Sequence, residues 1–150
     1  MESALLSRIK DATRKSMLAR DKTRVAALKL VNAEVKQVEL TQKGAVSDTD
    51  ITKILSRMVK QRQNSAEQYR VGNRPDLVEH ELYEIGVIKE FLPKQLTEEE
   101  LLITIGEVCN ELDAATAQDI GRVMGYLSKS LSGTADMSLV SRLVRERLSQ

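Results

Sequence analysis

Apolar residues recur every three or four positions along nearly the whole chain, and this spacing restricts the fold more than any other feature. It is clearest in residues 22–42, where the apolar positions are Leu28, Val31, Val35 and Val38. Such a period puts the apolar side chains on one face of an α-helix, whereas a half-buried strand needs strict alternation. No β-branched run alternates for long enough to indicate a sheet. We therefore predict an all-α, multihelical fold.

Turn and capping residues divide the pattern into two groups of helices. We expect four helices followed by three short ones, over about residues 3–19, 22–42, 48–70, 74–91, 98–112, 117–131 and 137–148. The clearest boundary is Pro93, which disfavours helix at the residue before it, followed by Thr97 and Glu100, which form a capping box. We therefore predict two all-α subdomains, 1–93 and 94–150, with a linker at about 93–96.

The same pattern predicts how individual helices end and which residues they bury. Glycine is the commonest residue just past a helix C-terminus, so we expect Gly44 to end the second helix and Gly72 to stop the third. On the fourth helix, the spacing predicts four inward-facing residues: Val78, Leu82, Ile85 and Ile88.

Charge is distributed unevenly, although the net charge is only +1. Residues 1–72 hold 15 Lys and Arg against 8 Asp and Glu, while residues 73–150 hold 8 against 14. A basic region attracts polyanions over a long range. On the third expected helix, Lys53, Arg57 and Lys60 share one face because they are spaced four and three apart. This stripe is either a solvated face or part of a nucleic-acid-binding surface.

The chain offers few groups for catalysis or metal binding. We interpret His80, the one histidine, as a solvated surface residue, and Cys109, the one cysteine, as a small buried side chain. One His and one Cys cannot supply the usual ligands of a zinc site. The acidic run of residues 98–100 suits a helix N-terminus without any metal. We therefore expect no catalytic residue, no metal site and no cofactor.

The chain also lacks the marks of secretion or membrane insertion. Its first residues, "MESALLSRIK", carry charges among the apolar positions, so they resemble neither a signal peptide nor a membrane span. A single cysteine excludes an internal disulfide and fits a reducing compartment. We expect a cytoplasmic location and no contact with membranes.

Two glycines lie four residues apart in "DIGRVMGYL", inside the sixth expected helix. Gly121 and Gly125 each cost roughly 1 kcal/mol relative to alanine, so we expect something to approach the backbone there. They belong to a stripe made only of small residues: Ala117, Gly121, Gly125, Ser128 and Ser132. Arg122 and Lys129 lie along its far side. We expect the stripe to pack against the adjacent helix of the same subdomain, with a partner protein or an RNA backbone as the alternatives.

Several segments resemble the YqeY-like family, which is similar to the C-terminal tail of the B subunit of the tRNA-dependent amidotransferase. They are "LARDKTRVAALKLVNAEVKQVEL", "VKQRQNSAEQYRVGNRPDLVEHELYEIGVIKEFLP", "EFLPKQLTEEEL", "DIGRVMGYL" and "GTADMSLVSRLVRERL". The resemblance implies two all-α subdomains and a role near tRNA. The catalytic kinase-like domain of that B subunit has no counterpart here. The resemblance therefore implies carbon–nitrogen ligase activity, with glutamine as amido donor, only within a complex.

The resemblance also assigns residues to the expected interface. Gly121, Arg122 and Gly125 match the family's pattern of two glycines around a basic residue. The family commonly continues with a lysine-rich turn, whereas this chain has "SGTA" at 132–135. Positive charge would then come from three other residues: Lys129, Arg142 and Arg145. We expect a non-catalytic tRNA-binding or tRNA-linked accessory module, with a protein-interaction module that docks a partner through its helices as the alternative.

Overall fold

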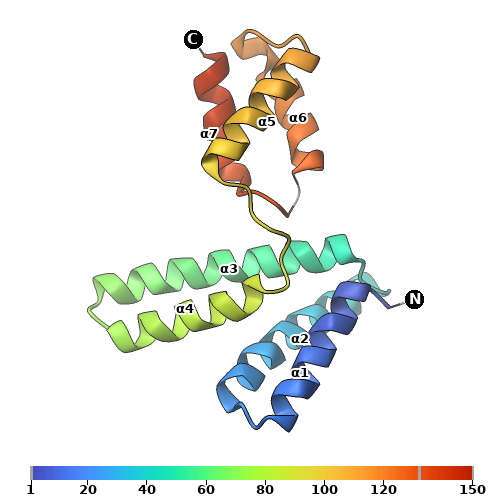
Figure 1. The fold of residues 1–150 in the computed structure, drawn as a ribbon, viewed down its shortest axis with the longest axis vertical. Helices are drawn as coiled ribbons and strands as arrows, with labels where there is room; N and C mark the ends of the chain where they lie inside the picture. The colour runs from blue at the N-terminus through green and yellow to red at the C-terminus, as the bar shows by residue number, and fades with distance from the viewer. Residues whose placement is uncertain (1, 132, 150) are drawn as a thin grey trace. The chain divides into compact units, whose positions relative to one another are not determined.

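A computed structural model describes residues 2–131 and 133–149, and within these ranges it contains only helices (Figure 1). The elements are α1 (Ala4–Leu18), α2 (Lys22–Gln42), α3 (Asp48–Val71), α4 (Pro75–Lys89), α5 (Glu98–Glu111), the 3₁₀ helix η1 (Ala117–Asp119), α6 (Ile120–Ser130) and α7 (Met137–Leu148). The predicted all-α fold is confirmed. The helices form two compact units, over residues 1–93 and 94–150.

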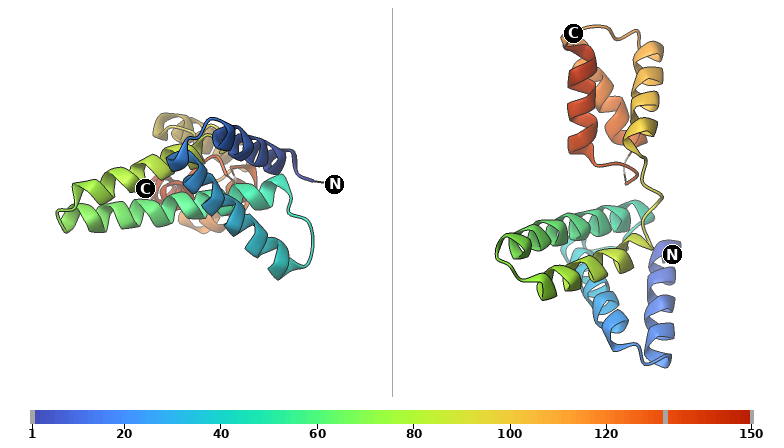
Figure 2. Two further views of the ribbon diagram at one scale, coloured as in Figure 1. Left: turned by 90° about the horizontal axis from the view of Figure 1, so that it is seen from below. Right: turned by 60° about the vertical axis from the view of Figure 1, so that its left-hand side comes forward.

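The first unit consists of two helical hairpins, one formed by α1 and α2 and the other by α3 and α4 (Figure 2). The 24-residue α3 contacts each of the other three helices. The centre of the unit is apolar and shielded from water, and its largest fully buried side chains are Ile9, Leu28, Val31, Ile51, Leu55, Met58 and Ile88. The two hairpins are therefore held together by one continuous core.

The second unit packs α5, α6 and α7 around a smaller core. Its largest fully buried side chains are Leu101, Ile105, Val123, Leu127 and Val140. The buried residues of each helix repeat at helical spacing, with Val140, Leu143 and Val144 on α7, so each helix turns one apolar stripe inward.

Side-chain caps fix the helix starts as the sequence predicts. The Ser47 hydroxyl accepts from the Asp50 amide, and the Asp50 carboxylate accepts from the Ser47 amide, which completes a capping box at α3. Thr97 caps α5 by accepting from the amide of Glu100, but the Glu100 carboxylate accepts from the Thr97 hydroxyl instead of its amide, so the predicted capping box is only half formed. Each cap satisfies backbone donors that the first helical turn leaves without a partner.

The predicted stop of the third helix at Gly72 is confirmed, since α3 ends at Val71 and Gly72 is its C-cap, whereas the predicted end of α2 at Gly44 needs correction. The residue in the left-handed region after α2 is Lys43, with φ of 55°, and its amide donates to the Glu39 carbonyl. After α3, Gly72 has an ordinary φ of −78°, and Asn73 takes the left-handed conformation with φ of 55°. Asparagine tolerates this conformation better than most residues. The left-handed residue therefore lies one position before Gly44 in the first case and one position after Gly72 in the second.

One of the residues predicted to face inward from α4 faces water. Leu82 is 56% exposed, whereas Glu84 is only 7% exposed. Glu84 faces α3, where its Oε1 lies 3.6 Å from Nε of Arg62. A polar contact between the two helices therefore occupies a position that hydrophobic spacing alone would give to an apolar side chain.

Candidate nucleic-acid interface

The small-residue stripe of α6 is open to solvent. Gly121 and Gly125 are exposed, and a Cβ built on either residue would meet no atom within 4 Å. The expected packing against an adjacent helix of the same subdomain is therefore wrong. The orientation of α6 about its axis explains this: Val123 and Leu127 point into the core, so the two glycines lie on the opposite, solvent-facing side of the helix. Ser132, the last member of the predicted stripe, lies outside the described residues.

Asp119 closes a capping box with Thr116 at the start of η1, just before α6. Its Oδ2 accepts hydrogen bonds from the backbone amides of Ala115, at 2.9 Å, and Thr116, at 3.0 Å. These bonds favour the ionised carboxylate and lower the pKa of Asp119 from 3.8 to about 2. Its other oxygen accepts from the Arg122 guanidinium at 3.0 Å. Arg122, a predicted nucleic-acid contact, is thus held by an acidic neighbour.

The other predicted cations of the second unit divide into paired and unpaired residues. Arg142 lies 3.1 Å from Glu146 and 3.9 Å from Glu98. Lys129 and Arg145 are exposed, and neither has an acidic partner within 4 Å among the residues described. These two are the predicted residues of this unit whose charge is free to meet an anion.

The predicted stripe on α3 lies on one exposed face of that helix. Lys53, Arg57 and Lys60 are all exposed, and they sit in the first unit, apart from the candidates on α6 and α7. Arg57 donates to Glu34 of α2 at 3.2 Å. No described acidic side chain comes within 4 Å of either lysine. The structure therefore brings the three residues together but neutralises the middle one.

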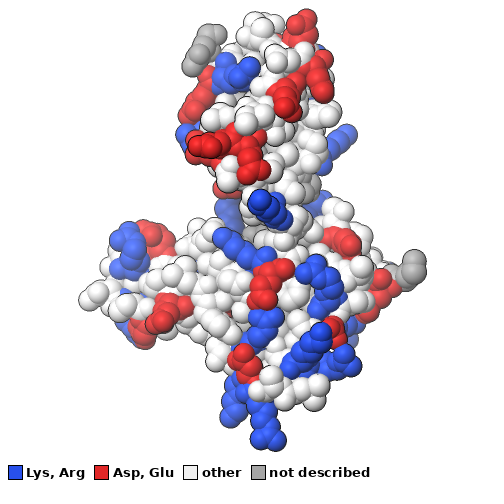
Figure 3. All heavy atoms as spheres, viewed as in Figure 1, with Lys and Arg blue, Asp and Glu red and all other residues white. Residues whose placement is uncertain are grey.

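More unpaired cations of the first unit lie on α2 and its flanking turns, and none of them is among the residues predicted to contact nucleic acid. They are Arg20, Lys22, Lys29, Lys36 and Lys43, all exposed and without an acidic partner within 4 Å in the described ranges. On the face that Figure 3 presents, Lys and Arg gather over the α1–α2 hairpin. The signal was present in the sequence as a seven-residue repeat of lysine, which places side chains on one side of a helix.

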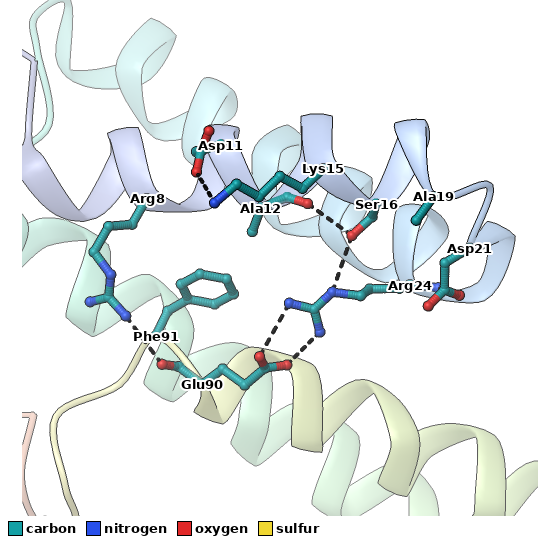
Figure 4. Close-up of a pocket in the computed structure, with 10 residues that line it drawn as sticks. All are labelled: Arg8, Asp11, Ala12, Lys15, Ser16, Ala19, Asp21, Arg24, Glu90 and Phe91. Atoms are coloured by element: carbon teal, nitrogen blue, oxygen red, sulfur yellow. Dashed lines mark hydrogen bonds and ion pairs between the residues drawn. The ribbon is translucent and has the colours of Figure 1, made fainter.

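A hollow of about 440 Å³ lies between α1, the start of α2 and the end of α4 (Figure 4). Phe91 forms part of its apolar lining, and the Arg8 guanidinium lies 5.7 Å from the centroid of the Phe91 ring. Arg24 donates to both carboxylate oxygens of Glu90, at 2.6 and 3.1 Å, and to the Ser16 hydroxyl at 3.1 Å. These bonds tie the two hairpins together, so Arg24 is committed to the fold.

The structure confirms the interpretation of His80 as a surface residue and of Cys109 as a buried side chain. The His80 side chain is 57% exposed, and Cys109 is 2% exposed within the second core. In the described part of the chain, no three His, Cys, Asp or Glu residues are grouped so that they could hold a metal ion. Within the same ranges, no helix is long and apolar enough to cross a membrane.

Comparisons with known proteins confirm the resemblance to the YqeY-like family. A family described as "Yqey-like protein" matches residues 6–148. "Altered inheritance of mitochondria protein 41, mitochondrial" from Clavispora lusitaniae is 28% identical over 134 residues, which cover 87% of this chain and 78% of that protein. The protein of the same name from Saccharomyces cerevisiae is 27% identical, over 66% of this chain and 54% of its own length. An uncharacterised Schizosaccharomyces pombe protein is 32% identical over 79 residues, which cover 53% of this chain and 64% of that protein.

Proposed function

The chain belongs to the YqeY-like family, and from this membership and its basic first unit we propose that it is a non-catalytic accessory module that binds tRNA. The observation that carries the proposal is the group of cations in the first unit that have no acidic partner within 4 Å in the described ranges. That unit holds 17 Lys and Arg against 13 Asp and Glu. Unpaired surface cations are the groups that release counterions from a phosphate backbone.

The proposed mode of binding is contact with backbone and shape. The chain has only four aromatic residues, and Phe91 is buried in the first core. Recognition of single-stranded RNA usually depends on bases stacked on exposed aromatic rings. Folded RNA with duplex arms, such as tRNA, presents ordered phosphates instead. Few aromatic residues and many unpaired cations suit the second kind of ligand.

Filter binding of tRNA across a salt series tests the proposal. We expect the logarithm of the association constant to fall linearly as the logarithm of the salt concentration rises. Replacing Lys53 and Lys60 by Gln should reduce that slope by about 2, since each phosphate contact contributes about 0.9. Arg70→Gln is the control, because Arg70 is exposed but already paired with Glu67. Absence of binding at about 50 mM salt would overturn the proposal.

A second candidate is a protein-interaction module, which the open face of α6 favours. Gly121 and Gly125 leave that face flat, and on α5 the side chains of Leu102 and Ile103 are 48% and 63% exposed. Flat or apolar surfaces of this kind are common where proteins associate. Gly125→Leu separates the candidates: loss of assembly in light scattering, with tRNA affinity unchanged, would support docking of a protein rather than of RNA.

A further inference from the structure

We infer that the outer ridge of α2 is a line of contact with the phosphate backbone of duplex RNA. The α2 ridge consists of Lys22, Ala26, Lys29, Ala33 and Lys36. The inference rests on the proposed function, since it assigns the RNA to one helix of the first unit and specifies the form of RNA bound.

The ridge follows from the geometry of the helix. Seven residues turn an α-helix through nearly two full turns, so Lys22, Lys29 and Lys36 lie in one row with a drift of about 20° per step. At a rise of about 1.5 Å per residue, the lysines are about 10.5 Å apart and span about 21 Å. All five ridge residues are exposed. The buried residues of α2 lie on the opposite side of the helix: Ala27, Leu28, Val31 and Val35.

Among the described residues, no ion pair engages the lysines of this row. No described acidic side chain lies within 4 Å of Lys22, Lys29 or Lys36. Of the acidic residues of α2, Glu34 bonds Arg57 of α3 at 3.2 Å, and Glu39 lines a hollow together with Lys36 and with Lys10 of α1 but forms no ion pair with Lys36. The row therefore presents three exposed positive charges with no negative charge between them.

The form of the ridge favours a duplex over the other polyanions. Alanines alternate with the lysines, so short side chains leave room for a rigid backbone to approach the helix. No aromatic residue lies on the ridge to stack an unpaired base. A membrane-bound helix needs a broad apolar face beside its charges, whereas the exposed large apolar side chains of α2 are Leu30 and Leu40, which are ten residues apart and form no continuous face. Backbone contact with a duplex uses the lysines alone.

The test compares two triple variants of the full chain that lose the same charge. The ridge variant loses all three cations through Lys22→Gln, Lys29→Gln and Lys36→Gln. For tRNA binding, its slope of log affinity against log salt should be smaller than that of the parent by about 3. The control variant loses three exposed cations that are paired with Asp11 or Glu67, through Arg14→Gln, Lys15→Gln and Arg70→Gln. That control should keep the slope within about 1 of the parent value. Circular dichroism verifies that both variants fold.

The outcomes separate the two claims. If the parent chain binds tRNA and the ridge variant keeps the full slope, the ridge inference is wrong and the proposed function stands. If the parent binds neither tRNA nor an RNA duplex of about 16 base pairs at low salt, both fail. A single strand of equal length that binds more tightly than the duplex would overturn the inference. Binding to phosphatidylserine vesicles that needs the ridge lysines, without binding to the duplex, would also overturn it.

Discussion

At the scale of single residues, Gly121 and Gly125 leave the backbone of α6 exposed at positions where a side chain would fit. A Cβ at either position would meet nothing within 4 Å, and neither residue has a positive φ that would demand glycine. Each glycine therefore lowers the stability of α6 without any benefit to packing within the unit. The open surface itself is then the feature that these residues provide.

Alanine should therefore stabilise the protein at these positions. We expect Gly125→Ala to raise the free energy of unfolding by about 0.5 to 1 kcal/mol, because alanine restricts the unfolded chain and meets open space in the folded one. Gly133→Ala is the matched contrast: Gly133 has φ of 81°, where a side chain is strained, so that change should destabilise. Urea denaturation measures both. A loss of stability in Gly125→Ala would mean that the α6 face is covered.

The lowered pKa of Asp119 predicts how its contribution to stability depends on pH. Its folded-state pKa of about 2 lies below the ordinary 3.8, because its carboxylate accepts backbone bonds from Ala115 and Thr116. A depressed pKa means that its contribution to stability is present above about pH 4 and is lost as the pH falls toward 2. Carbon-detected NMR titration of the Asp119 carboxyl should give a midpoint near 2. A midpoint close to 3.8 would mean that the hydrogen bonds from Ala115 and Thr116 to Asp119 do not form.

At the scale of elements, the α3–α4 hairpin is joined by a buried ion pair. The Arg62 and Glu84 side chains are 15% and 9% exposed, and Nε of Arg62 has no hydrogen-bond partner among the described atoms. His80 lies 3.5 Å from the same Glu84 oxygen. Such a pair gains little over an apolar contact, but either member alone is costly to bury.

A double-mutant cycle tests this description of the hairpin. Glu84→Leu leaves Arg62 without its carboxylate, and we expect it to cost about 3 kcal/mol of stability. Adding Arg62→Met should restore much of that loss, since two apolar side chains can fill the space without a buried charge. Leu82→Ala, on the exposed side of α4, serves as the control and should change stability by less than about 0.5 kcal/mol. Additive losses in the double variant would contradict the coupling.

Helices were more predictable from the sequence than the contacts between them. The apolar period and the caps at Ser47 and Thr97 are local signals, so the helix starts follow from a few neighbouring residues. Burial of Glu84 depends on Arg62, 22 residues earlier in the chain, and no single-helix pattern contains that information. The same limit explains Arg57 and Arg142: their faces were predictable, but the acidic partners come partly from other helices.

At the scale of the whole molecule, charge separates the two units. The first has 17 Lys and Arg against 13 Asp and Glu, and the second has 6 against 9. We therefore propose that the first unit supplies most of the attraction to RNA, with Lys129 and Arg145 as local contacts in the second. The family could be predicted from the order of motifs, whereas the free cations became visible only once the ion pairs were known.

We expect the isolated chain not to transfer amide nitrogen. Purified protein supplied with glutamine, ATP and a tRNA misacylated with Glu or Asp should form no amidated product, because the proposed role is to hold RNA while other domains perform the chemistry. Thin-layer analysis of the released amino acid measures the reaction, with a complete amidotransferase as the positive control. Turnover by this chain alone would show that it has a catalytic role.

The most direct test of the central claim is amide NMR of the labelled chain titrated with tRNA at low salt. We expect shifts and broadening to concentrate in residues 20–43 and 53–60, where most of the unpaired cations of the first unit lie. We expect little change along the acidic α5, residues 98–111. A spectrum that tRNA leaves unchanged, or one perturbed only along α5, would contradict binding of tRNA through the first unit.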